Sequence, residues 1–300
     1  MPYWQGKSKG SKGGYSIFVW TLKKLGVYPA YFLLIFVTLY YFLFSFKSSK
    51  AIFYYFNKRM GYNKISSIFK IYSNYFLFGQ TLIDKVVIMS EIPNPFTFHF
   101  DGEENLKKIV EMGKGGILLS AHIGNWEAAG HLLKRLGTRI NIVMYDGEHK
   151  QIKEYLDSVT GGWSDHIKII VIRDYISHIY EITEAFNNNE LICMHADRFL
   201  EGNRTIPYNF LGKEALFPLG PFLLAAQFKV PVSFVFSMKE SLSHYHFFAS
   251  EILDYDIESK KNKIQKIITD FVDAMEKKVK AYPLQWYNYY NFWQTEKWTS

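Results

Sequence analysis

A histidine and a glutamate separated by four residues, His122 and Glu127, are the pair in this chain best suited to acid–base chemistry. Within one regular helix, residues five positions apart point about 140° away from each other. The pair therefore cooperates only if the chain bends between the two residues. An imidazole that has one nitrogen held by a carboxylate keeps the other nitrogen as a base. The spacing predicts His122 as a general base and Glu127 as its orienting partner.

The residues around this pair indicate a strand, a tight loop and a helix. Residues 117–119 (ILL) follow two glycines and form a short apolar run that is typical of a buried strand. From Asn125 onward the apolar residues recur at helical spacing, and Asn125 is a suitable N-cap. This reading places His122 in the loop after the strand and Glu127 in the first turn of the helix.

The same loop offers backbone N–H groups at Gly124, Asn125 and Trp126. At the start of a helix such groups have no intrahelical partner, and we expect them to face developing negative charge. No Gly-x-Ser-x-Gly motif surrounds the pair. The sequence therefore favours a base that deprotonates a substrate hydroxyl directly, without a covalent enzyme intermediate.

Two other readings of His122 and Glu127 stay open. The first is structural: a capped helix after a strand, with His122 satisfied inside the loop. The second is a metal hydrolase that uses His122, Glu127, His195 and Asp197 as ligands. The spacing is not that of His-Glu-x-x-His, and the set spans the ends of two predicted strands. We expect no metal here.

The run from His122 to Glu127, HIGNWE, resembles the His-x4-Asp/Glu signature of glycerolipid-type acyltransferases. Its Gly-Asn-Trp-Glu form is similar to the bacterial lipid A late acyltransferase family, within the lysophospholipid acyltransferase-like superfamily. The resemblance implies transfer of a fatty acyl group from a thioester, of acyl carrier protein or coenzyme A, to a lipid hydroxyl. It also implies that His122 acts as the base, that Glu127 is its partner, and that no cofactor is needed.

A second cluster follows a later predicted strand: Asp197 and Arg198, then Arg204. An arginine fork at a strand end suits a phosphate or a carboxylate, so Arg198 or Arg204 is expected to hold an anionic acceptor or a phosphopantetheine phosphate. An ion pair between Asp197 and Arg198 that closes the loop is the structural alternative.

The family shows an Asp, an aromatic-x-Gly and a Pro-x-Gly in this region. Asp197, Gly212 and Gly220 match that pattern, and the resemblance implies a substrate-binding role for them. Residues 146–149 (DGEH) depart from the Arg-containing segment that is usual in lipid A enzymes. The sequence here looks closer to acyltransferases of aryl polyene and flexirubin-type clusters. The acceptor therefore stays open between a lipid A-type lipid and an aryl polyene, flexirubin or aminolipid.

The composition favours an anionic partner and a lipid surface. Aromatic residues make up 18% of the 300 residues, and the formal net charge is +7. Such a charge attracts anionic headgroups or an acidic carrier protein. We expect no nucleic-acid partner, because the chain has no nucleic-acid motif and no dense arginine cluster. The single cysteine, Cys193, excludes an internal disulfide and suits a reducing compartment.

Residues 25–46 carry no charge and are mostly apolar or aromatic. This length is enough to cross a bilayer core of about 30 Å. Lysines flank the segment on both sides, so the positive-inside rule gives little preference for an orientation. We favour a helix or helical hairpin that embeds in one leaflet over a single span. The expected location is a bacterial inner membrane, with the catalytic domain on its cytoplasmic face.

After residue 90, strand-like and helix-like runs alternate, which predicts an α/β fold with a mixed, largely parallel sheet flanked by helices. The expected strands are 117–119, 139–145, 167–172, 190–196 and 230–238, and the expected helices 101–112, 149–159, 175–187, 221–228 and 257–282. Active sites in such sheets lie at the carboxyl ends of the strands. We expect a flexible basic N-terminus (1–14), a membrane-associated helical region (15–90) and an acyltransferase domain (91–300). A non-catalytic membrane scaffold is the remaining alternative.

Overall fold

A seven-stranded sheet, in the order β1-β9-β8-β2-β5-β3-β4, forms the centre of the molecule. The computed structural model describes residues 12–89, 94–145, 166–172 and 177–293. Five neighbouring strands, from β8 to β4, run parallel, and β9 pairs antiparallel with β8. The strands are β1 (Thr97–Asp101), β2 (Gly116–Ser120), β3 (Ile140–Tyr145), β4 (Ile167–Ile172), β5 (Leu191–His195), β8 (Val232–Lys239) and β9 (His244–Ala249). The predicted α/β class and the largely parallel sheet are confirmed.

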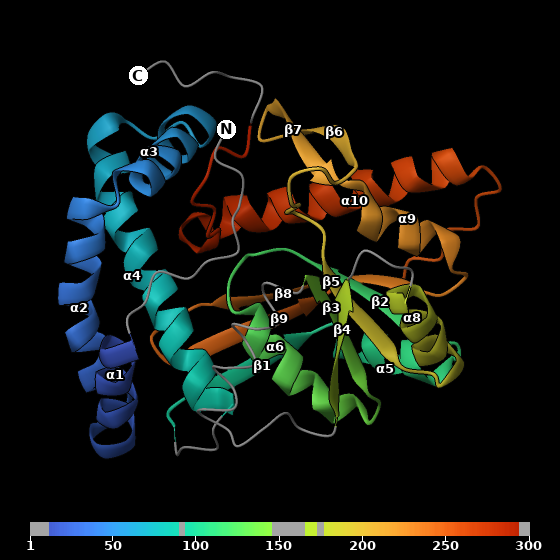
Figure 1. Ribbon diagram of the computed structural model, residues 1–300, viewed down its shortest axis with the longest axis horizontal. Helices are drawn as coiled ribbons and strands as arrows, with labels where there is room; N and C mark the ends of the chain where they lie inside the picture. The colour runs from blue at the N-terminus through green and yellow to red at the C-terminus, as the bar shows by residue number, and fades with distance from the viewer. Residues whose placement is uncertain (1–11, 90–93, 146–165, 173–176, 294–300) are drawn as a thin grey trace.

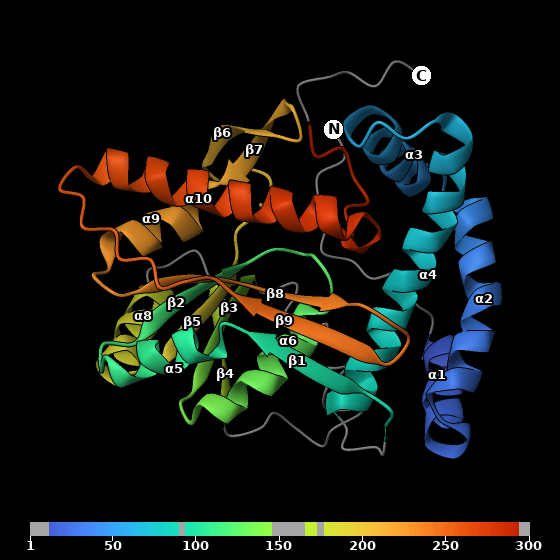
Figure 2. The same ribbon diagram turned by 180° about the vertical axis from the view of Figure 1, so that it is seen from behind.

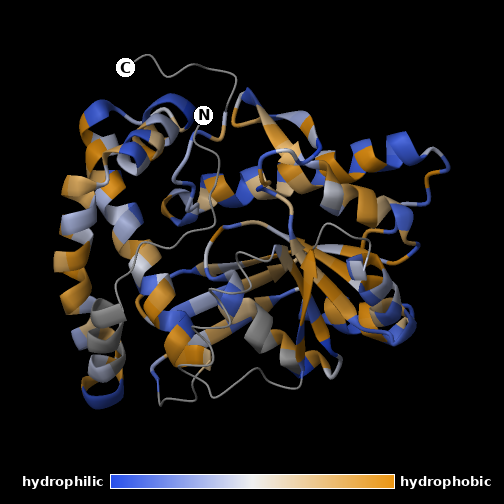
Figure 3. Cartoon of the chain, viewed as in Figure 1, coloured by the Kyte–Doolittle hydropathy of each residue, from blue (hydrophilic) through white to orange (hydrophobic). Residues whose placement is uncertain are grey.

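Helices cover both faces of this sheet. Figures 1 and 2 show α9 (Leu219–Gln227) and α10 (Lys260–Ala281) on one face, and α5 (Glu103–Glu111) and α6 (Trp126–Leu132) on the other. Helix α8 (Ser177–Asn187) adds Ile182 and Phe186 to the same apolar core as α9 and α10. The interior strands are apolar on both sides because both faces are covered, and Figure 3 shows hydrophobic residues along them.

The interior strands lie where the sequence places them. Strands β3 and β4 end at the predicted residues, and β5 and β8 differ from the prediction by one or two residues at each end. Asn125 caps α6 as expected: its side-chain oxygen accepts a hydrogen bond from the backbone nitrogen of Ala128. The helix expected over residues 149–159 lies outside the described residues, as do residues 1–11 and 146–149.

Four strands at the margins of the fold were not predicted from the sequence, and they form two pairs. One pair is the edge strand β1 and its neighbour β9. The other is the separate hairpin of β6 (Thr205–Phe210) and β7 (Lys213–Pro218). Residues Leu211 and Gly212 form the two-residue turn of this hairpin, both with positive φ, at 51° and 76°. These strands alternate polar with apolar residues over short lengths, so no continuous apolar run marks them.

The N-terminal region forms a layer of helices beside the sheet (Figure 1). It consists of α1 (Lys12–Leu25), α2 (Val27–Phe44), α3 (Phe46–Tyr54), the π-helical turn η1 (Tyr55–Arg59) and α4 (Lys64–Met89). Helix α2 packs closely along α4: a Cβ atom at Gly79 of α4 would overlap the side chain of Leu34. Helix α4 also joins the core of the sheet through Ile71 and Tyr75. Helix α4 therefore packs against both the N-terminal helices and the sheet, and it ends at Met89, next to the boundary expected near residue 90.

Helix α2 is long and apolar enough to cross a membrane, the one helix of that kind among the described residues. Its buried residues, among them Ala30 and Leu34, form the side that faces α4. Large apolar side chains remain exposed on the rest of its surface: Tyr28, Phe32, Ile35, Phe36, Leu39, Tyr40, Leu43 and Phe44. Such a continuous apolar surface is typical of a contact with lipid or protein.

A buried ion pair fastens the N-terminal helices to the sheet. The carboxylate of Asp84, on α4, contacts the ammonium of Lys239, at the end of β8, and the hydroxyls of Tyr31 and Tyr245. Burial raises the pKa of Asp84 and lowers that of Lys239, while the attraction between the two charges opposes both shifts. Because both charges are buried, removal of either side chain would leave the other as a buried charge without a counter-ion.

Substitution Lys239→Met should destabilise the protein by about 3–5 kcal/mol, because it leaves the carboxylate of Asp84 buried without its cation. Denaturation of the purified protein in detergent, followed by circular dichroism, measures this change. Lys107→Met is the matched control, since Lys107 forms an exposed pair with Glu103 on α5 and should cost no more than about 0.5 kcal/mol. Equal stability of the two variants would contradict the structural role of the buried pair.

Candidate active site

Two neighbouring parallel strands bring His122 and Asp197 together. Strand β2 ends at Ser120 and β5 ends at His195, and these two residues are directly paired. His122 and Asp197 each follow two residues later, at the carboxyl edge of the sheet. This is the edge at which active sites of α/β sheets lie, as the sequence predicts for His122.

The carboxylate of Asp197 holds His122 at two points. Its Oδ1 atom lies 2.7 Å from Nδ1 of the imidazole, and its Oδ2 atom accepts a hydrogen bond of 3.1 Å from the backbone nitrogen of His122. The side chain of Asp197 is fully buried, and that of His122 is 13% exposed. A carboxylate on Nδ1 fixes the tautomer of the ring and directs the basic function to Nε2.

Electrostatics keep Asp197 ionised. Burial by itself raises the pKa of this carboxyl group, but the charge and hydrogen bond of His122, together with the nearby Arg198, outweigh burial and hold the pKa well below its usual range. Asp197 is therefore a carboxylate at any pH at which an imidazole titrates. A permanent negative charge beside Nδ1 stabilises the imidazolium that forms when His122 accepts a proton.

Glu127 has a different partner from the one expected. Its carboxylate forms an ion pair with Lys85, which α4 contributes, and both side chains are largely buried. The orienting contact at Nδ1 of His122 comes from Asp197, a residue that the sequence reading assigns to substrate binding. The reason is the course of α6: Glu127 belongs to its first turn, which packs on α4, whereas the loop turns His122 toward the end of β5.

The backbone nitrogens of the loop are also used differently from the expectation. The N–H group of Gly124 donates to the carbonyl oxygen of Gln285, and that of Asn125 to the carbonyl oxygen of Ser237. These two groups are thus engaged inside the protein and do not form an oxyanion hole in this structure. Gly124 has a φ of 64°, and a Cβ atom there would overlap the carbonyl oxygen of Ser237. Its role is to let the loop pass close to β8.

The C-terminal segment of residues 283–287 holds the loop from the other side. Trp286 forms a bridge with Ile123, and the backbone nitrogen of Tyr287 donates to the carbonyl oxygen of His122. The side chain of Gln285 bonds both backbone groups of Lys239, at 2.8 and 2.7 Å. Trp286 and Tyr287 are buried. The segment of residues 283–287 is therefore part of the core that positions His122.

His195 and Lys85, which the sequence did not assign to the acyltransferase site, complete its surroundings. The ring of His195 lies 4.3 Å from that of His122, and Trp126 packs edge-on against His195 at 4.4 Å. Burial, with the neighbouring His122, holds the pKa of His195 well below its usual range, so this ring is neutral. The sequence could have indicated His195 as a site residue, because it lies at the end of a predicted strand. Nothing in the sequence indicates Lys85, because it lies in a separate helix.

The remaining predicted residues divide into two groups. Arg198 is largely buried, and its Nη2 atom donates to the carbonyl oxygen of Tyr287 at 2.6 Å, so it has an internal partner. Arg204 is exposed just before β6. Gly212 lies in the β6–β7 turn and Gly220 in the first turn of α9, and a Cβ atom added at either position would meet no neighbouring atom within 4 Å. Their substrate-binding role stays a prediction.

The ligand-type atoms of His122, His195 and Asp197 lie within 4.8 Å of one another. Nδ1 of His195 is buried and has no hydrogen-bond partner in the described part of the chain. The Nδ1 atom of His122 and the Oδ1 atom of Asp197, however, already bond to each other. Both oxygens of Asp197 thus face His122, which is the arrangement of a carboxylate that orients an imidazole base.

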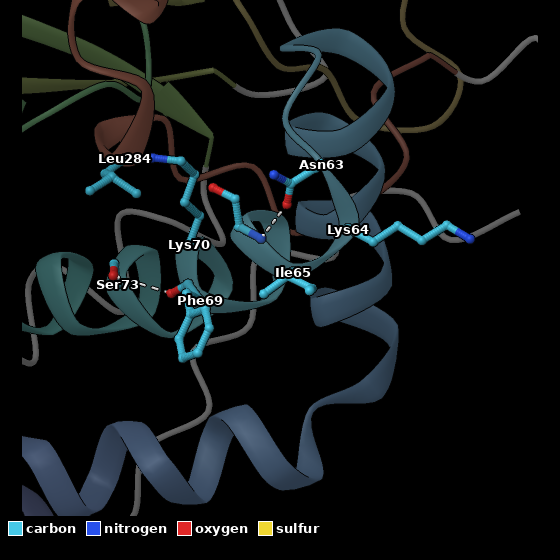
Figure 4. A pocket seen from close by; sticks show the side chains of 8 residues that line it. Asn63, Lys64, Ile65, Phe69, Lys70, Ser73 and Leu284 are labelled. Atoms are coloured by element: carbon cyan, nitrogen blue, oxygen red, sulfur yellow. Dashed lines mark hydrogen bonds between the residues drawn. The ribbon is translucent and has the colours of Figure 1, made fainter.

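A groove lies elsewhere, at the N-terminal end of α4, with a volume of about 830 Å³. Figure 4 shows the side chains that line it, including Lys64, Ile65, Phe69, Lys70 and Leu284. None of the predicted site residues is among them. Basic and apolar side chains line this groove, and most of them belong to α4, the helix against which α2 packs.

The fold and the site define an α/β protein with a histidine suited to general-base catalysis at the carboxyl edge of its sheet. Comparison with known families agrees with this class. Residues 73–295 match the family described as bacterial lipid A biosynthesis acyltransferase, and the chain belongs to this family. Membership supports an acyltransferase that acts on lipid and confirms the resemblance drawn from the His-x4-Glu run.

Comparison with solved structures finds the 1-acyl-sn-glycerophosphate acyltransferase PlsC from Thermotoga maritima. The identity is 15% and the TM-score 0.37, over 84% of this chain and 97% of that chain. No curated protein sequence matches this chain.

Substitution Asp197→Asn should lower kcat by about 10²–10⁴-fold with little change in KM, because the amide no longer fixes the basic tautomer of His122. Steady-state kinetics of the purified enzyme with an acyl thioester measure this effect. Glu127→Gln is the comparison variant. Full activity of Asp197→Asn together with a large loss in Glu127→Gln would return the orienting role to Glu127.

Proposed function

We propose that this protein transfers a fatty acyl chain from the thioester of acyl carrier protein to a hydroxyl group of a lipid acceptor. The observation that carries this proposal is the contact between His122 and the buried carboxylate of Asp197, within a chain of the lipid A acyltransferase family. The pair supplies a base of fixed orientation, which is what the deprotonation of a hydroxyl requires.

The reaction proceeds in one displacement. Nε2 of His122 accepts the proton of the acceptor hydroxyl as its oxygen attacks the thioester carbonyl carbon. The tetrahedral intermediate then expels the thiolate, which takes the proton back from His122. An ester bond forms, a thioester bond breaks, and His122 returns to its neutral form with Asp197 on Nδ1. No residue of the protein becomes acylated.

Charge supports acyl carrier protein as the donor. The formal net charge of +7 favours an acidic protein, and Arg204 is an exposed cation that a phosphopantetheine phosphate would fit. Coenzyme A is the alternative donor. The acceptor is a lipid A-type hydroxyl or, in the second version of the proposal, an aryl polyene, flexirubin or aminolipid.

Lipid extracts of a deletion strain, complemented with the wild-type gene or with His122→Ala, should differ by one acyl group in mass spectra. The deletion strain and the His122→Ala strain should both accumulate the lighter species, because a missing general base costs about 10²–10⁴-fold in rate. The mass of that species identifies the acceptor. Arg139→Ala is the control, since Arg139 lies half-exposed before β3. An unchanged lipid profile in a strain that contains folded His122→Ala protein would contradict catalysis by His122 and favour a non-catalytic membrane scaffold.

We also propose that the exposed side of α2 embeds in the cytoplasmic leaflet of a bacterial inner membrane. One side of α2 is buried against α4, so the helix cannot present an apolar surface to lipid all around. Exposed Ile65, Ile68 and Phe69 of α4 extend the apolar surface. Lys64 and Lys70, at the groove of Figure 4, suit anionic headgroups beside it. Embedding in one leaflet agrees with this arrangement better than a span.

The triple substitution Phe32→Ser, Phe36→Ser and Tyr40→Ser should release the protein from membranes, since each side chain is more than half exposed. Burial of one such side chain contributes about 1.5–3 kcal/mol, so loss of three should lower binding to anionic phospholipid vesicles by well over tenfold. Vesicle flotation measures the bound fraction. Tyr180→Ser, on the exposed part of α8, is the control. Equal binding of both variants would refute the embedding of α2.

A further inference from the structure

The polar face of the β1–β9 edge carries a second cluster of histidine and carboxylate side chains, unrelated to His122. His99 of β1 and His246 of β9 are directly paired neighbours in the parallel ladder, and their rings lie 4.6 Å apart. Asp101 lies two residues after His99 and therefore points to the same face of the strand. The alternate residues of both strands, such as Phe100 and Phe247, are apolar and pack on the opposite face.

The potential ligand atoms of these three residues converge. Nε2 of His99 lies 3.1 Å from Oδ1 of Asp101, and Nε2 of His246 lies 2.9 Å from Oδ2 of the same carboxylate. All three ligand atoms lie within 4.8 Å of one another. In a tetrahedral zinc site with bonds of about 2.0–2.2 Å, ligand atoms are about 3.3–3.5 Å apart. The cluster needs only a small opening to reach that spacing.

The second ring nitrogen of His246 also has a carboxylate partner. The Nε2 atom is buried and faces Oδ2 of Asp101. Its Nδ1 atom bonds Oε1 of Glu240 at 3.0 Å, and the hydroxyl of Tyr282 donates to the same oxygen at 2.7 Å. A carboxylate on the second ring nitrogen is the arrangement that orients metal-binding histidines.

The local charges also suit a divalent cation. Asp101 and Glu240 contribute two negative charges, and Lys278 of α10 is the nearby cation that acts on both. The Nζ atom of Lys278 lies over the ring of Phe248, 2.9 Å from its centroid, which places it beside the cluster. His244, the other histidine of β9, has its Nδ1 atom 2.7 Å from the hydroxyl oxygen of Thr97. The cluster therefore keeps an excess of negative charge.

We propose that His99, Asp101 and His246 form a zinc site, with water as the fourth ligand and Glu240 as the carboxylate that orients His246. Two histidines and one carboxylate are a ligand set that zinc accepts. The ion fastens the edge strand β1 to β9 and, through Glu240 and Tyr282, to the end of α10. Its role is structural, because no residue of the acyltransferase site belongs to it.

Zinc titration of the metal-free, full-length protein in detergent, followed by calorimetry, tests this site. The wild type should bind one zinc ion per chain, His99→Gln should lower the affinity by more than about tenfold, and Glu240→Gln by about 10–100-fold. His178→Gln, on α8, is the matched control and should bind as the wild type does. His195→Gln should also bind normally, which separates this site from the cluster around His122.

Thermal unfolding provides the second readout. His99 and Asp101 are exposed, with 60% and 57% of their side chains accessible, so metal-free wild type and His99→Gln should unfold at the same temperature. Zinc should raise the unfolding temperature of the wild type alone, since binding to the folded state stabilises it. Absence of zinc binding by the wild type, or loss of binding in His195→Gln with retention in His99→Gln, would overturn the proposal.

Discussion

The buried carboxylate of Asp197 is the constraint on which the rest of the candidate active site depends. An ionised group without access to water is stable only if charged or polar partners surround it, and here His122 provides both a ring nitrogen and a backbone nitrogen. The contact exists because β2 and β5 are neighbours in the sheet and end at the same level. The strand order therefore determines the chemistry of the site.

The loop that carries His122 is held by groups from distant parts of the chain. Residues 283–287 lie against one side of it, and α4 holds that segment in turn: Asn74 donates to the carbonyl oxygens of Leu284 and Trp286. Asn125 donates to the hydroxyl of Tyr245, which contacts the buried Asp84 of α4. The helices that we place at the membrane and the loop that bears His122 thus share one polar network.

The interior of the fold was accessible from the sequence, whereas its margins were not. Strands β3, β4, β5 and β8 are apolar because both faces of the sheet are covered, and that composition is readable directly. The edge strand β1 has the pattern TFHFD, which also suits a linker, and only its pairing with β9 makes it a strand. The hairpin of β6 and β7 likewise depends on a turn at Leu211 and Gly212 that the motif-based reading did not identify.

The sequence by itself determined the loop that bears His122 and the family, and it singled out His122 as the proposed base. Local rules suffice for these features: an apolar run makes the strand, Gly124 opens the loop, and Asn125 caps the helix. Only the tertiary structure decided the partners. Asp197 reaches His122 across 75 residues of chain, and Glu127 reaches Lys85 of α4 instead. Spacing along the chain reports which residues are near in sequence, but the order of strands and the packing of α4 set which carboxylate meets the imidazole.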